Sequence, residues 1–172
     1  MYDVYDLTFS EPALTTFTML RQAWLAVSKL AETRLAKVGL TPETLAVLWA
    51  CRDYPGKLIP AEIARLTHRE NQTIAGLLNR MEREGLTQRI PKRKGQPFTE
   101  IKITAKGKQL CDSGVPIMKS VITDVMAGLS MRNQEKFQEL SKTVRDQALE
   151  RLHIEAGPPT WILSGKPIRV KW

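Results

Sequence analysis

The stretch 62–107, EIARLTHRENQTIAGLLNRMEREGLTQRIPKRKGQPFTEIKITAKG, decides the fold of this 172-residue chain. It begins with the apolar periodicity of a short helix, and after a turn a second apolar-periodic helix runs to Gly85. Two alternating runs, 87–90 and 99–103, then flank the loop PKRKGQP, which is typical of a β-hairpin with a cationic tip. Two helices followed by such a hairpin predict a winged helix-turn-helix, in which one helix reads duplex DNA and the hairpin, or wing, contacts its backbone.

The positive charge of the chain is concentrated in the same stretch. From Arg65 to Lys108 there are eleven Lys and Arg against four Glu, a net charge of +7, whereas the whole chain carries +8. An excess confined to one segment indicates a polyanionic partner there, because Lys and Arg displace the counterions that condense on phosphates. The alternative reading of this charge is an ordinary solvated basic face.

Amphipathic helices are expected on both sides of this module. The seam of a helix over 12–37 follows alternating steps of three and four, so that helix needs a helical partner. Thr41 followed by Pro42 is a capped start for the next helix. Thr104 and Ser130 are the expected caps of two further helices, and the helical pattern stops after His153.

The predicted fold class is mainly α with a small β-wing: a winged helix-turn-helix plus long dimerisation helices. The predicted parts are an N-terminal dimerisation helix in 1–40, the DNA-binding module in 41–104, C-terminal dimerisation helices in 105–153 and an apolar tail in 154–172. The tail holds two short β-prone runs that are too apolar for a solvated linker. We expect it to dock beside the dimer helices, with an unstructured end as the alternative.

Composition argues against several classes of protein. No apolar run approaches the roughly 20 residues of a membrane span, and the N-terminus lacks the pattern of a signal peptide. Two cysteines 60 positions apart and two histidines make neither a disulfide framework nor a metal-ligand spacing. Without a phosphate-binding loop or a nucleophile elbow, an enzyme is not expected. We therefore predict a cytoplasmic protein without cofactor or metal and without a membrane partner.

The second helix of the module has two chemically different faces. Ile74, Leu77, Leu78 and Met81 share the side expected to be buried. The opposite side and its flank are polar, and Gln or Asn there can pair with adenine and Arg with guanine. The residues predicted to contact DNA from this recognition helix are Arg69, Gln72, Thr73, Gly76, Asn79, Arg80 and Arg83. Those predicted to contact phosphates from the wing are Arg89, Lys92, Arg93 and Lys94.

The order of these elements resembles the MarR (multiple antibiotic resistance regulator) family of transcription factors. The fragments that carry the resemblance are LTP at 40–42, EIA at 62–64, TI at 73–74, MEREGL at 81–86 and ITAKG at 103–107. They resemble the family's start of the second helix, its E-L-A, its T-V, its L-E-x-x-G-L and its closing L-T-x-x-G. The match spans about residues 12–152.

The resemblance implies a homodimer that represses transcription at a pseudo-palindromic operator, often relieved by a small-molecule effector or an oxidant. The apolar seam of the first helix independently favours a dimer, because it would leave a large exposed patch in a monomer. The residues predicted to lie in the dimer interface are Phe17, Leu20, Trp24, Val27, Val144 and Leu149. One departure is that the family's wing carries an acid, D-x-R, whereas PKRKGQ at 91–96 has none.

Two other functions remain open from the sequence. One is a redox sensor acting through Cys51 or Cys111, although a small buried apolar residue is the commoner role of a cysteine. The other is a redox- or ligand-responsive winged helix that binds a protein, with DNA contact secondary. The segment of net charge +7 argues against this last reading.

Overall fold

The computed structural model describes residues 5–90 and 99–154. The wing tip, with Lys92, Arg93 and Lys94, and the tail beyond Ile154 lie outside the described residues, as do predictions made on them. In chain order the elements are α1 (Pro12–Ala36), α2 (Pro42–Asp53), α3 (Pro60–Thr67), α4 (Asn71–Arg83), β1 (Thr87–Ile90), β2 (Glu100–Ile103), α5 (Ala105–Met126) and α6 (Met131–Arg151). The predicted fold class, mainly α with a small β-wing, is confirmed.

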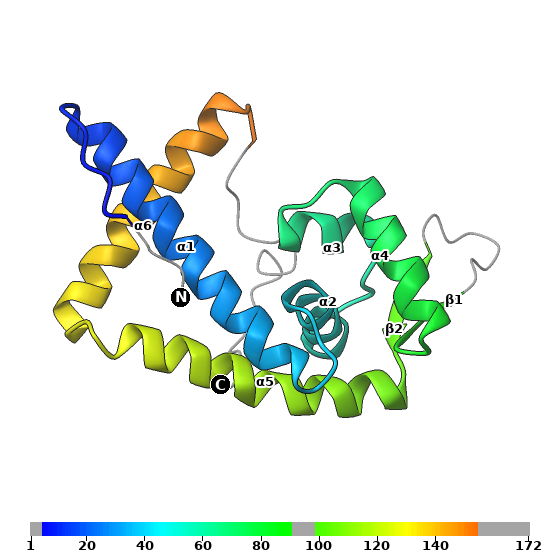
Figure 1. Cartoon of the computed structure of the whole chain (residues 1–172). Coiled ribbons are helices and arrows are strands. Elements are labelled where there is room, and N and C mark those ends of the chain that lie inside the picture. Colours follow the sequence, from blue (N-terminus) through cyan, green and yellow to red (C-terminus); the bar gives the residue numbers. More distant parts are fainter. Residues whose placement is uncertain (1–4, 91–98, 155–172) are drawn as a thin grey trace.

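Helices α2, α3 and α4 and the two strands gather at one end of the molecule, and α5 runs beneath them (Figure 1). Their shared apolar cluster also takes in the C-terminal part of α1 and the first half of α5. Among the described residues, the largest fully buried side chains are Leu35, Val47, Leu48, Ile63, Ile74, Leu78, Met81, Cys111 and Val121. The side of α4 predicted to be buried is thus confirmed: Ile74, Leu78 and Met81 are fully buried, and Leu77 is partly buried against the same cluster.

Side-chain caps set the starts of three helices where the sequence predicts them. The hydroxyl oxygens of Thr41, Thr104 and Ser130 accept hydrogen bonds from backbone N–H groups three residues later, at 3.1, 3.0 and 3.3 Å. Thr104 also donates to the carbonyl of Gly85 at 2.7 Å, so the cap ties the start of α5 to the end of α4. Because β1 and β2 lie between Gly85 and Thr104 in the chain, this hydrogen bond brings the two ends of the wing together.

The two wing strands are antiparallel, with Thr87 opposite Ile103 and Ile90 opposite Glu100. The backbone N–H of Ile101 donates to the carbonyl of Leu58 at 2.8 Å, which attaches β2 to the segment before α3. Strand β2 therefore attaches the base of the wing to the helical module.

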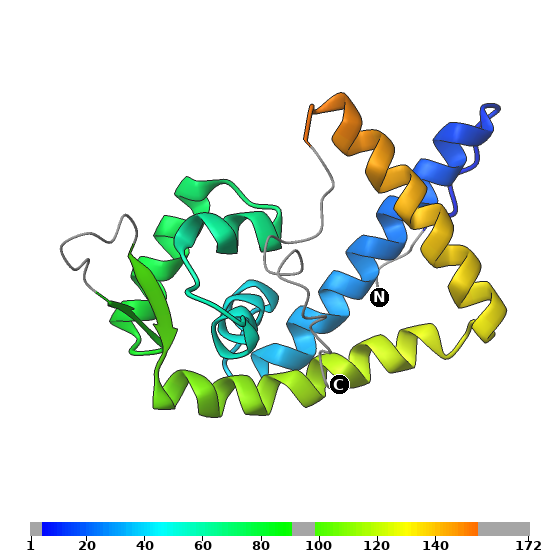
Figure 2. The ribbon, with the colours of Figure 1, turned by 180° about the vertical axis from the view of Figure 1, so that it is seen from behind.

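Helices α1, α5 and α6 form an open frame at the other end of the molecule, as both views show (Figures 1 and 2). The C-terminal half of α1 packs on α5, where Arg34 donates to Asp124 at 2.5 Å and to Ser120 at 3.2 Å. None of the residues of α6, all of which the structure describes, is buried. Among the described residues, no helix is long and apolar enough to cross a membrane.

Candidate nucleic-acid interface

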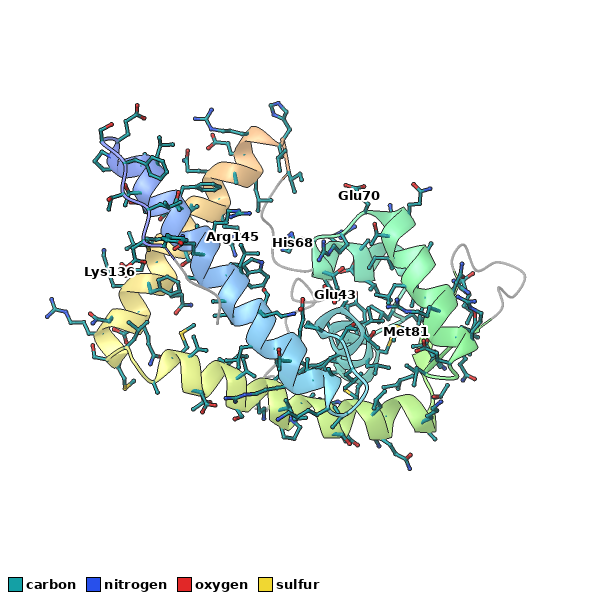
Figure 3. All side chains as sticks on the ribbon, viewed as in Figure 1. Glu43, His68, Glu70, Met81, Lys136 and Arg145 are labelled. Atoms are coloured by element: carbon teal, nitrogen blue, oxygen red, sulfur yellow. The ribbon has the colours of Figure 1, made fainter. Side chains whose placement is uncertain are left out.

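The recognition helix α4 presents a continuous polar surface. Its core side packs inward, and Figure 3 shows Met81 on the side of α4 that faces the other helices of the module. The remaining predicted residues of the helix are all exposed together: Gln72, Thr73, Gly76, Asn79, Arg80 and Arg83. The predicted polar stripe exists as a surface, and its contact with DNA stays a prediction.

Gly76 leaves a gap in the middle of this stripe. A Cβ built at Gly76 meets no atom within 4 Å, so nothing in the fold requires glycine there. Because glycine in a helix interior costs about 0.5–1 kcal/mol relative to alanine, its presence favours the close approach of another molecule to the backbone. A base or phosphate edge seated against α4 would make such an approach.

Arg69 lies in a different place from the one predicted. It belongs to the turn between α3 and α4, two residues before α4 begins at Asn71. The left-handed backbone of His68, with φ 50°, ends α3, and the N–H of Arg69 donates to the carbonyl of Ala64 at 2.9 Å. The guanidinium of Arg69 forms an ion pair with Glu43 of α2 at 3.5 Å, with both side chains about half exposed. Arg69 therefore links the turn to α2 and is not part of the helical stripe.

Arg89 of β1 is held by two residues of α4. Its Nη1 donates to Oε2 of Glu82, its backbone N–H donates to Oε1 of Glu82 at 3.0 Å, and its Nη2 donates to Oδ1 of Asn79 at 2.7 Å. The prediction placed Arg89 on a phosphate, but here its charge is compensated by a carboxylate. Glu82 was not singled out from the sequence, because it lies on α4 whereas Arg89 lies on β1.

A hollow on the same surface is lined by Asn79, Glu82 and Arg83. Asn79 and Glu82 stand one helical turn apart on the flank of α4 that faces the wing. The recognition helix and the base of the wing therefore share one hydrogen-bonded cluster at this point, which we call the helix–wing cluster: Asn79, Glu82 and Arg89.

The two thiols lie in an apolar setting between α2 and α5. Cys111 is fully buried and Cys51 is half-buried against the same core. Burial raises the pKa of the Cys51 thiol to about 12 and also raises the pKa of Cys111. Arg52, whose charge favours a thiolate at Cys111, donates to Asp53 at 2.7 Å and to Asp112 at 3.0 Å. Burial therefore disfavours the reactive thiolate form at both cysteines.

We predict that iodoacetamide modifies Cys51 and Cys111 only slowly in the folded protein. At pH 8 a thiol with a pKa of about 12 has roughly 1000-fold less thiolate than an ordinary cysteine, and thiolate is the reactive form. Intact-mass measurement should show slow labelling in buffer and two rapid additions in urea. Labelling of Cys51 in buffer at the rate seen in urea would contradict the burial argument and reopen thiol sensing.

The predicted interface residues of the long helices lie at the surface. Trp24 is 70% exposed and Phe17 63%, and Leu20 and Val144 are exposed as well. Val27 and Leu149 are half-buried. Their pairing with a second chain stays a prediction.

Among the residues that the structure describes, no group of three or more His, Cys, Asp or Glu is placed to hold a metal ion.

No family model matches the chain, and no curated protein matches it. Solved structures do. A probable transcriptional regulator from Pseudomonas aeruginosa is 24% identical with a TM-score of 0.65, over 74% of this chain and 94% of that one. A mutant MarR from Escherichia coli, complexed with operator DNA, is 15% identical with a TM-score of 0.70, over 80% and 99%.

A third similar structure is the organohalide-sensing transcriptional regulator RdhR in its 2,4-dichlorophenol-bound form. It is 16% identical with a TM-score of 0.76, over 92% of this chain and 99% of that one. The structure of this chain is therefore a winged helix-turn-helix with long flanking helices. Its fold is that of the MarR-family transcriptional regulators, as the sequence resemblance predicts.

Proposed function

We propose that this protein is a sequence-specific, double-stranded DNA-binding transcriptional regulator that acts as a homodimeric repressor at a pseudo-palindromic operator. The observation that carries the proposal is the exposed stripe on α4. It joins amides, a hydroxyl and two arginines on one face of a helix that lies within the segment of net charge +7. Amides and arginines of this kind pair with base edges in the major groove. The similar MarR structure that contains operator DNA supports this use of the fold.

A dimer is supported by the surface of α1 and α6. Large apolar side chains stand exposed along both helices, and a soluble monomer rarely exposes a large contiguous apolar patch. A two-fold pair of such chains would place the two recognition helices about 34 Å apart, one turn of DNA. This geometry requires an inverted-repeat site.

We also propose that a small molecule regulates this binding. The support comes from two similar regulators: RdhR, whose structure holds 2,4-dichlorophenol, and BpsR from Bordetella bronchiseptica, whose DNA binding is regulated by 6-hydroxynicotinic acid. The high pKa of Cys51 argues for a ligand over an oxidant as the signal.

The decisive experiment measures affinity for a selected duplex against salt concentration. Six to ten neutralised phosphates per dimer give a log–log slope of roughly −5 to −9. Fluorescence anisotropy with the site recovered from a random duplex library provides the measurement. A slope near zero, or no enrichment of any sequence, would exclude this function and favour a protein partner.

Two variants separate base reading from backbone contact. Gln72→Ala removes an exposed amide of α4 and should lower affinity by about 1–3 kcal/mol only for duplexes with the preferred base pair. Arg93→Ala should weaken binding to all duplexes alike and make the slope shallower by about two in a symmetric dimer. Lys136→Ala on α6 is the charge-matched control, since Lys136 lies at the opposite end of the molecule (Figure 3). It should leave both quantities unchanged.

A further inference from the structure

The helix–wing cluster bears on how the proposed recognition helix reads a base. Arg89 donates from its side chain to both α4 residues of the cluster, and its own backbone N–H donates to Glu82. The Glu82 carboxylate thus accepts hydrogen bonds from both the main chain and the guanidinium of Arg89. The side chains of Arg89 and Glu82 are about one-third exposed and Asn79 is exposed, so the cluster stands at the surface where DNA would lie.

The chemistry of this cluster fixes the direction of the Asn79 amide. A guanidinium has only donors, so it can face the amide oxygen and not the amide NH₂ group. With Oδ1 held at 2.7 Å from Nη2 of Arg89, the Nδ2 group is the end of the side chain left for another molecule. Within the part of the chain that the structure describes, no hydrogen bond engages Nδ2.

We propose that Arg89 is a positioning residue for base recognition: by holding the oxygen of Asn79 toward the wing, it makes Asn79 read DNA as a hydrogen-bond donor. This inference rests on the proposed DNA-binding function. Paired donors match the acceptors of guanine or thymine at the major-groove edge, whereas adenine needs both an acceptor and a donor from the same amide. It replaces the adenine pairing predicted from the sequence at this position.

The same cluster predicts that Arg89 contributes little to phosphate binding. Its guanidinium faces the Glu82 carboxylate, so its approach to DNA brings little net positive charge. Arg80 and Arg83, by contrast, have no acidic partner among the described residues. The positive charge that meets DNA near α4 therefore comes from these two arginines.

The test compares base preference in wild type, Asn79→Ala, Arg89→Ala and the double variant, each on duplexes varied one base pair at a time. Wild type should select guanine or thymine at the position that Asn79→Ala makes indifferent. Each single variant should lower discrimination there by about 5- to 150-fold, and the double variant should lower it no further. Combining Arg89→Ala with Gln72→Ala should instead give additive losses at two positions.

Two further variants distinguish positioning from charge and from folding. Arg89→Lys keeps the positive charge but lacks the planar fork that spans Glu82 and Asn79, so it should lose the preference at an unchanged salt slope and melting temperature. Asn79→Asp keeps an acceptor for Arg89 and removes the donor, so the preference should move to cytosine, whose N4 donates.

Three results would overturn the proposal while leaving DNA binding established. One is an equal loss on all duplexes for Arg89→Ala, with a salt slope shallower by about two. Another is full additivity of Arg89→Ala with Asn79→Ala. The third is selection of adenine by the wild type at the position that Asn79 controls. Failure of the proposed function looks different, because the wild type itself would then enrich no sequence.

Discussion

Gly107→Ala should cost about 3 kcal/mol or more of folding free energy, the largest loss we expect from adding a single methyl group to this chain. A Cβ at Gly107 would lie 2.1 Å from the carbonyl oxygen of Leu86 and 3.0 Å from Cγ1 of Ile103. That carbonyl cannot move aside freely, since it accepts from both the N–H and the hydroxyl of Thr104 at 3.1 Å. The first turn of α5 would have to separate from the end of α4. Urea unfolding followed by circular dichroism measures the loss.

Gly76→Ala is the matched control, because the same methyl group enters open space on the exposed side of α4. It should raise stability by about 0.5–1 kcal/mol, the usual gain of alanine over glycine in a helix interior. If DNA seats against the backbone at Gly76, the same variant should weaken specific binding while it stabilises the fold. Equal free energies of unfolding for Gly107→Ala and wild type would contradict the prediction, because they would show that the Leu86 carbonyl and α5 can separate without a loss of stability.

Much of the fold could be predicted because its signals are local. Caps at Thr41, Thr104 and Ser130 act within one turn of their own helices, and each makes the expected hydrogen bond. The buried side of α4 follows from periodicity alone, and Ile74, Leu78 and Met81 are buried as predicted. Caps and periodicity report on a residue's near neighbours, so they succeed wherever tertiary contacts do not compete.

The candidate site was less predictable because its details depend on contacts between elements. Periodicity extends the polar stripe to Arg69, but the left-handed backbone at His68 ends α3 and delays α4 to Asn71. A count of positive charges cannot show that Arg89 is already paired, since its partner Glu82 lies on another element. The direction of the Asn79 amide depends in turn on Arg89. Each error arises where the position of a side chain depends on a turn or on a residue of another element.

Helix α1 exposes several large apolar side chains, and a variant on this surface should have the second large effect. Side chains of α1 that are exposed and apolar are Leu14, Phe17, Met19, Leu20, Trp24 and Leu25. Helix α6, without a buried residue, adds Phe137, Leu140 and Val144. A partner that covered these side chains would remove apolar surface from water, which favours association.

Trp24→Glu should therefore convert the proposed dimer into a 19.5 kDa monomer, because a carboxylate cannot be buried unpaired in an apolar interface. Affinity for an inverted-repeat duplex should fall by at least about 100-fold, since two half-sites are no longer bound as one linked event. Light scattering and anisotropy measure the two effects.

Thr33→Glu is the control: Thr33 is exposed nine residues further along α1, about 180° around the helix from Trp24. It should leave mass and affinity unchanged. A wild type of 19.5 kDa at micromolar concentration would contradict the dimer itself, and a dimeric Trp24→Glu would move the interface away from this face of α1.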